Sequence, residues 1–273
     1  METISRICVR YSRLWLSLAK FSLLGELAFR ANFLVKVFVE LLWLGILLVF
    51  NFTIFRQTGT VANWTEYDYL FFIGCYFAMG GLIETLFLEN CNEFADLIRS
   101  GDLDFFLLKP IDEQFLISCR KIDWACAPNV VLGFLVMGGA LWLGEHPVTP
   151  QSAALFLLMF GSGAALAYGM LVTMMSASIW LMRNQSLFEM WWLFTTLMRH
   201  PRSIFVGRFA SPAGLFFSFV VPIMLVTNVP AEVMVRGIDW RIVAYALFAS
   251  VIAVMGSRWV FRTALKRYRS ASS

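Results

Sequence analysis

The sequence lacks most of the residue patterns on which common catalytic sites are built. It contains two His residues, and neither has a second ligand at a spacing typical of a metal site. It has no GxxxxGK[ST] run, no GxSxG elbow and no HExxH run, so the chain has no P-loop of its own with which to bind a nucleoside triphosphate. The five Cys residues include no CxxC pair. These absences predict a chain that is not an enzyme and that binds no cofactor or metal itself.

Charge is scarce as well. Only 15% of the 273 residues are charged, whereas 59% are hydrophobic, and these include 27 Phe and 10 Trp. Such a composition is typical of a protein integral to a membrane and surrounded by lipids. The net charge of +4 is too small to indicate binding to nucleic acid. We therefore expect one membrane domain that comprises residues 1–273.

The apolar runs predict an all-α membrane protein with six spanning helices. A hydrocarbon core of about 30 Å requires about 20 residues of helix. Residues 1–22 place Arg and apolar side chains on opposite helical faces, which predicts an amphipathic helix in the headgroup layer. Residues 187–210 are predicted to form an interfacial segment on the cytoplasmic side, with a seventh, re-entrant segment as the alternative. The predicted spans are residues 32–54, 67–88, 124–144, 152–181, 213–230 and 241–262.

The distribution of Lys and Arg predicts the orientation. With the N-terminus in the cytoplasm, most Lys and Arg fall on the cytoplasmic side, including Arg199 and Arg202 of the predicted interfacial segment. Both termini are therefore expected to be cytoplasmic, together with residues 89–123. The Arg residues left on the outer side are Arg56, Arg236 and Arg241.

Two carboxylates, Glu40 and Glu84, lie inside predicted spans. A charge buried in lipid costs at least about 2.5 kcal/mol, so such residues suggest a function. One interpretation pairs Glu40 with Lys36, one turn away, and places Glu84 at the cytoplasmic interface. The other places both residues on a path for a transported substrate.

Residues 89–123 form the longest interval that could not lie in a bilayer. The first part has the pattern of an amphipathic helix, which Gly101 would end. Acidic and then apolar residues follow, up to the helix-breaking Pro110. Because no soluble domain is predicted to cover this surface, we expect it to bind a partner. The apolar positions at helical spacing are Cys91, Phe94, Leu97 and Ile98.

The run from Ile98 to Pro110, IRSGDLDFFLLKP, resembles a signature of the permease subunits of bacterial type-2 ABC transporters. The similarity is to a branch long catalogued as an uncharacterised exporter component, and it extends over nearly the whole chain. Weaker similarities to the same family occur at 28–33, 221–223, 229–231 and 266–272.

This resemblance implies a type-2 ABC exporter fold with an N-terminal elbow helix and a cytoplasmic coupling helix in the loop 89–123. Two permease subunits, identical or related, would join two cytoplasmic ABC ATPase subunits that bind ATP and Mg. The complex would lie in the bacterial plasma membrane and export a hydrophobic or amphipathic substrate. Phe94, Leu97 and Ile98 would anchor the coupling helix in an ATPase groove, and charged neighbours would set its register. The implied coupling residues are Glu93, Phe94, Leu97, Ile98, Arg99, Gly101, Asp102, Leu103 and Asp104.

Two other classes of membrane protein would require different sequence features. A secondary transporter or channel that needs no ATPase would be expected to contain an inverted repeat and several midplane charges. An intramembrane enzyme that acts on lipid would need clustered His, Asp or Glu at a membrane boundary. The sequence contains no convincing repeat, and His146 and His200 are far apart in the predicted topology.

Overall fold

The computed structural model describes residues 2–181, 185–205 and 212–268, so the predicted segments 187–210 and 266–272 lie partly outside the described residues. Every regular element in these ranges is a helix, as the all-α prediction requires. The elements are α1 (Glu2–Ala28), α2 (Arg30–Thr58), α3 (Glu66–Ile83), the π-helical η1 (Glu84–Leu88), α4 (Glu89–Ser100), α5 (Leu103–Leu107), α6 (Glu113–Ser118), α7 (Ala127–Leu143), α8 (Pro150–Leu181), α9 (Gln185–Met198), α10 (Arg202–Phe205), α11 (Pro212–Leu215), the π-helical η2 (Phe216–Val220), α12 (Leu225–Val235) and α13 (Trp240–Leu265).

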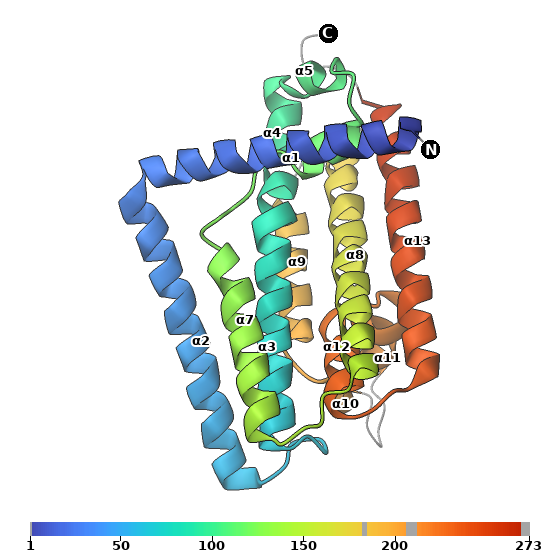
Figure 1. Ribbon diagram of the computed structural model, residues 1–273. Helices are drawn as coiled ribbons and strands as arrows, with labels where there is room; N and C mark the ends of the chain where they lie inside the picture. The colour runs from blue at the N-terminus through green and yellow to red at the C-terminus, as the bar shows by residue number, and fades with distance from the viewer. Residues whose placement is uncertain (1, 182–184, 206–211, 269–273) are drawn as a thin grey trace.

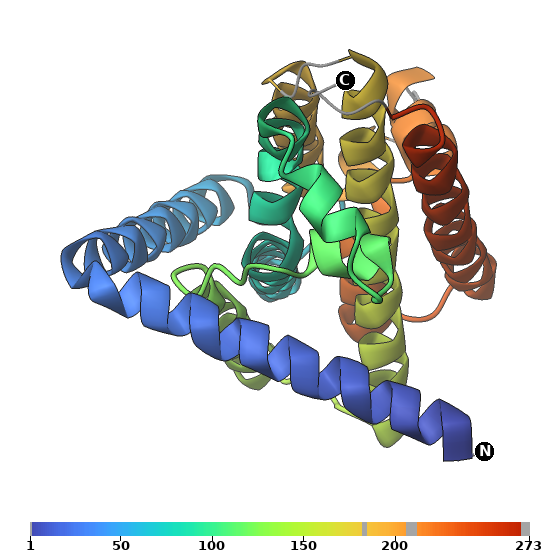
Figure 2. The same ribbon diagram turned by 90° about the horizontal axis from the view of Figure 1, so that it is seen from above.

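The long helices form a bundle, and α1 lies across one end of it (Figures 1 and 2). We call this end, which also holds α4, α5 and α6, the α1 end, and the other the far end. Four continuous helical stretches in the described residues are long and apolar enough to cross a membrane. They are α2, the stretch from α3 through η1 to α4, α8 and α13, and two shorter apolar helices, α7 and α12, accompany them.

The predicted coupling helix α4 is a continuation of the spanning helix α3. The helix begins at Thr65, whose side chain and that of Asp68 form a reciprocal capping box, and it ends at Gly101. Gly101 has a φ of 77°, a left-handed conformation that glycine adopts without strain, so the predicted helix end is confirmed. The expected break at residue 88 is absent, because the π turn η1 joins the two helices. A movement of α4 would therefore act directly on α3.

Small residues set the spacing of the helices. A Cβ atom at Gly133 of α7 would lie 2.4 Å from the backbone nitrogen of Ala78 in α3, so these two helices meet backbone to backbone. A Cβ atom at Gly169 of α8 would lie 2.6 Å from the backbone carbonyl carbon of Ala253 in α13, so these two helices also meet closely. Such close contacts let dispersion forces hold helices together where lipid removes the hydrophobic driving force.

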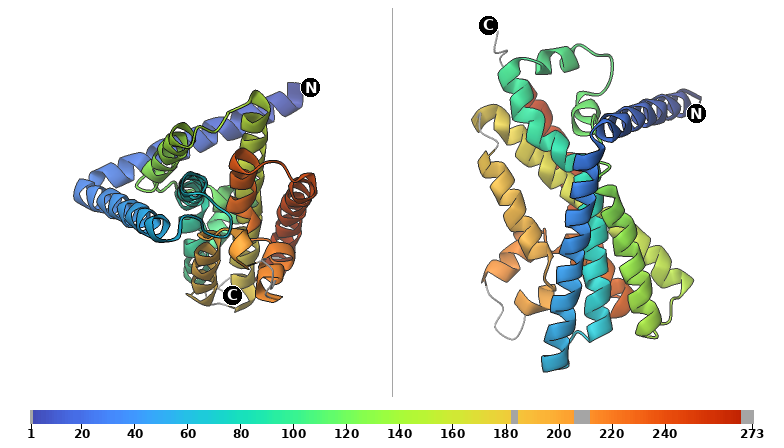
Figure 3. Two further views of the ribbon diagram at one scale, coloured as in Figure 1. Left: turned by 90° about the horizontal axis from the view of Figure 1, so that it is seen from below. Right: turned by 90° about the vertical axis from the view of Figure 1, so that its left-hand side faces the viewer.

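The segment between α8 and α13 differs from its prediction. Helix α9 does not lie at the α1 end but runs along the bundle beside α8 (Figures 1 and 3). The predicted span 213–230 is not one helix, because residues Val221–Met224 between η2 and α12 are not helical. Ser203 of α10 accepts a hydrogen bond of 2.9 Å from the indole Nε1 of Trp64. Trp64 lies just before α3, at the far end of the bundle. The Arg199–Ser203 turn is therefore in the far half of the bundle.

Candidate functional site

The apolar face of α4 is buried inside the subunit. Phe94 of α4 is fully buried and Leu97 and Ile98 are nearly so, and Leu103, the first residue of α5, is fully buried as well. Phe94 packs against Phe261 of α13 with ring centroids 6.2 Å apart. These side chains are therefore not exposed for an ATPase groove in the way that the resemblance implied. They fix α4 to the bundle instead.

A different set of residues is exposed at the tip of this unit. Arg99 forms an exposed ion pair with Asp96, and Asp102 accepts a hydrogen bond of 2.8 Å from Ser100. In and after α5, which contains Asp104, the side chains of Phe105 and Leu108 are 68% and 81% exposed. Large apolar residues that project at the end of a helical unit are available for contact with another protein. We call Arg99, Asp102, Phe105 and Leu108 the docking face.

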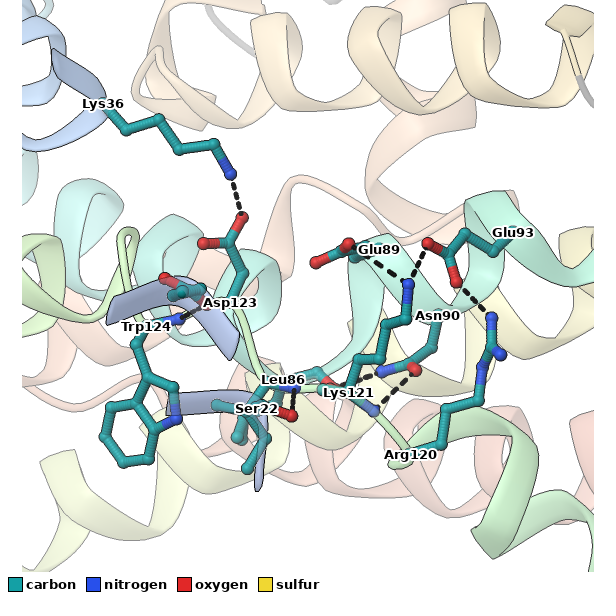
Figure 4. Close-up of polar contacts among 12 residues, drawn as sticks. Ser22, Lys36, Leu86, Glu89, Asn90, Glu93, Arg120, Lys121, Asp123 and Trp124 are labelled. Atoms are coloured by element: carbon teal, nitrogen blue, oxygen red, sulfur yellow. Dashed lines mark hydrogen bonds and ion pairs between the residues drawn. The ribbon is translucent and has the colours of Figure 1, made fainter. Parts of the chain in front are cut away.

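Asn90 and Glu93 on α4 bind the segment that leads back towards α7 (Figure 4). Asn90 is 1% exposed; its Nδ2 donates to the carbonyl oxygen of Lys121 at 2.8 Å, and its Oδ1 accepts from the Lys121 amide at 3.0 Å. Glu93 forms ion pairs with both Arg120 and Lys121. The return segment, residues 119–126, is thus locked to α4.

Four consecutive amides of the return segment donate to different parts of the fold. The amide of Lys121 binds α4, that of Ile122 binds Ser22 Oγ, that of Asp123 binds the Thr85 carbonyl, and that of Trp124 binds Glu26 Oε1. The Asp123 carboxylate also pairs with Lys36 Nζ at 3.2 Å. The return segment therefore connects α4 with η1, α1 and α2. Helix α1, whose amphipathic pattern suits the lipid headgroup layer, therefore also packs on the return segment of its own chain.

Helix α6 forms a second polar junction at the α1 end. Asp112 binds the guanidinium of Arg258 in α13 through both carboxylate oxygens, and its amide donates to Tyr11 Oη of α1. Gln114 Nε2 donates to Tyr168 Oη of α8 at 3.0 Å. Burial disfavours the Asp112 carboxylate, but the hydrogen bonds from Arg258 and from the Phe115 amide outweigh this, so the pKa of Asp112 lies below its ordinary value.

Sequence reasoning missed this junction. The available signal was Arg258, a charge inside the last predicted span that required an acidic partner. Its partner is 146 positions earlier in the chain, beyond the reach of any local pattern.

The two intramembrane carboxylates lie together. Glu40, Glu84 and Cys126 each place one potential ligand atom within 4.8 Å of the others. Glu40 accepts a hydrogen bond of 2.9 Å from Asn129 Nδ2. The interpretation that pairs Glu40 with Lys36 is wrong, because the ammonium group of Lys36 pairs with Asp123 instead. Both carboxylates line a cavity of about 260 Å³ between α2, α3, α7 and α9.

Long apolar helices, joined to a polar unit that projects at one end, define an integral membrane subunit. A family model described as ABC-2 family transporter protein matches residues 41–272. The chain therefore belongs to the ABC-2 transporter family, and it is a permease component of an ABC transporter. Membership of the ABC-2 transporter family favours an ABC permease over a secondary transporter, a channel or an intramembrane enzyme that acts on lipid. No curated protein and no solved structure matches the chain.

Proposed function

We propose that this permease subunit pairs with a second permease subunit and two cytoplasmic ATPase subunits to export a hydrophobic or amphipathic substrate. ATP and Mg would bind the ATPases, because the chain has no P-loop. The observation that carries the proposal is the docking face, whose exposed apolar residues lie in and just after α5, directly beyond the end of the helix that continues from α3. The family makes an ATPase the fitting partner for that surface.

We propose that the subunit lies in a bacterial plasma membrane with its α1 end on the cytoplasmic side. Lys and Arg remain concentrated at this end even though Arg199 and Arg202 belong to the far half. Helix α1 would then be the elbow helix, and α2, α3, α7, α8, α9 and α13 would be the six spans. The α11–α12 region would be a re-entrant hairpin from the outer side, where its freed backbone groups find protein partners.

The buried contacts of α4 suggest how ATP hydrolysis moves the bundle. A push on Phe105 and Leu108 would reach α4 across the turn at Gly101 and Asp102, beside which Leu103 is fully buried, and would then pass along the continuous helix from α4 into α3. The same push would reach α1 and α2 through the return segment. Its amides bind Ser22 and Glu26 of α1, and the Asp123 carboxylate pairs with Lys36 of α2. Phe94 and the Asp112–Arg258 pair would carry the motion to α13. A rigid unit of this kind can tip spanning helices between inward-open and outward-open states.

The test is co-purification of the full-length chain with the P-loop ATPase of a neighbouring reading frame, followed by ATPase measurement in nanodiscs. Leu108→Gln removes an exposed apolar contact from the docking face and should reduce recovery of the ATPase at least about 10-fold. Val148→Gln, at an exposed apolar position of the far end, is the matched control and should have no effect. Equal recovery with both variants would contradict the proposed docking face.

A further inference from the structure

The cavity between α2, α3, α7 and α9 holds two negative charges that the coupling role does not use. Glu40 comes from α2, and Glu84 is the first residue of the π turn η1. π turns inside α-helices often mark functional sites. Two carboxylates within 4.8 Å of each other repel strongly in a low-dielectric surrounding unless they share a proton or a cation.

Neither described basic residue near this cavity pairs with the two carboxylates. Lys36 Nζ is held by Asp123 at 3.2 Å. Arg199 lines the cavity, but its guanidinium stacks over the rings of Trp43 and Tyr76, at 5.1 and 5.8 Å from their centroids. No ion pair within 4.0 Å joins Arg199 to a carboxylate of the described residues. The acidic end of the cavity is therefore suited to an external cation.

Asn129 adds an independent indication of a bound ligand. Its side chain is 3% exposed and lines the cavity, and its Oδ1 has no hydrogen-bond partner while its Nδ2 holds Glu40. A buried carbonyl oxygen without a donor costs roughly 1–3 kcal/mol, so a donor is expected there. Gly81 of α3 packs against Asn129, which keeps the amide in place.

The acceptors and the cavity walls fit an organic ammonium better than a metal ion. Glu40, Glu84 and Asn129 Oδ1 supply three acceptors, and a primary ammonium has three N–H donors. A volume of about 260 Å³ far exceeds the space that a metal ion needs. The remaining walls include the aromatic rings of Trp43 and Trp192, which attract cations and apolar groups alike.

We propose that this cavity binds amphipathic primary amines, with the ammonium group between Glu40, Glu84 and Asn129 and the apolar part along the aromatic walls. The inference rests on the proposed export function in that such amines would be the transported compounds. It adds the chemical class of the substrate and an entry point within one subunit.

The test is equilibrium binding of radiolabelled dodecylamine to the full-length chain in phosphatidylcholine nanodiscs, a lipid without a primary amine. Empty nanodiscs give the background from partition into lipid. We expect saturable binding that Glu40→Gln and Glu84→Gln each weaken by at least about 10-fold, because each loses a charged acceptor. Glu145→Gln, at an exposed position outside the cavity, should bind as the wild type does.

A second measurement needs no variant. Dodecyltrimethylammonium carries the same charge and chain but has no N–H donor, so it should compete for the wild-type site at least about 10-fold more weakly. Equal competition, or no saturable binding, would overturn the proposal. Cobalt(II) binding with a thiolate absorption band that Cys126→Ser removes, without amine binding, would replace it with a metal site. These binding measurements use the chain without an ATPase, so a failure of the proposed docking face would not alter their outcome.

Discussion

The return segment is predicted to open as one unit when its contact with α4 is removed. Asn90→Ala deletes both hydrogen bonds that Asn90 makes to Lys121. Two bonds at about 1 kcal/mol each give a loss of about 2 kcal/mol in the free energy of opening. This corresponds to roughly 30-fold faster amide exchange for a segment that exchanges by local opening.

Hydrogen–deuterium exchange with mass spectrometry can measure this in nanodiscs. The amides of residues 121–124 should all exchange faster, although only that of Lys121 contacts Asn90 directly. Asp96→Asn is the control on the same helix, because its pair with Arg99 is exposed and contributes only about 0.5 kcal/mol or less. Faster exchange at Lys121 alone would refute the idea that this segment links α4 to α1 and η1 as one body.

Two further predictions concern packing and pH. Gly133→Ala should destabilise the chain by about 3 kcal/mol, because the new Cβ meets the α3 backbone. Gly138→Ala, in the same helix, should not, because a Cβ there meets nothing within 4 Å. Reaction of the buried Cys75 with a thiol dye during heating measures the melting temperature of each variant, and equal melting temperatures would contradict the packing account. Asp112→Asn should cost about 1–2 kcal/mol by removing the two-oxygen contact with Arg258. Because the folded-state pKa of Asp112 is lowered, that stability is present above the ordinary pKa of 3.8 and is lost as the pH falls through the lower folded value. The difference in melting temperature from the wild type should therefore persist from pH 8 to about pH 5, and a difference that vanishes near pH 6 would contradict this assignment.

Several features could be predicted from the sequence because they depend on local patterns. Long apolar runs located α2, α8 and α13, and a glycine at the end of an amphipathic run located the end of α4. The same amphipathic pattern could not reveal which protein covers the apolar face. Phe94 packs on the chain's own Phe261, and a partner groove would have selected the same residue type.

The position of the region after α8 was predicted wrongly, because its basic side chains contact residues that are distant in the sequence. Arg199 and Arg202 look like headgroup residues in the sequence. In the fold, Arg199 stacks on Trp43 and Tyr76, and Arg202 pairs with Glu232 at 3.4 Å. Internal partners of this kind let charges lie deeper than hydropathy allows.

The cavity was predicted only in part. Glu40 and Glu84 were selected because they are charges inside apolar runs. The contribution of Asn129 could not be predicted, since it depends on α7 packing against Gly81 and on a hydrogen bond across 89 positions.

The most direct test of the coupling role is photo-crosslinking of the assembled complex. Leu108→p-benzoylphenylalanine places the crosslinker on the docking face, and Trp142→p-benzoylphenylalanine places it at a position of equal exposure, 81%, at the far end. The proposed function predicts an ATPase adduct from position 108 and none from position 142. An adduct from neither position in an active complex, or from position 142 alone, would contradict the claim that the ATPase binds the tip of the α4–α5 unit.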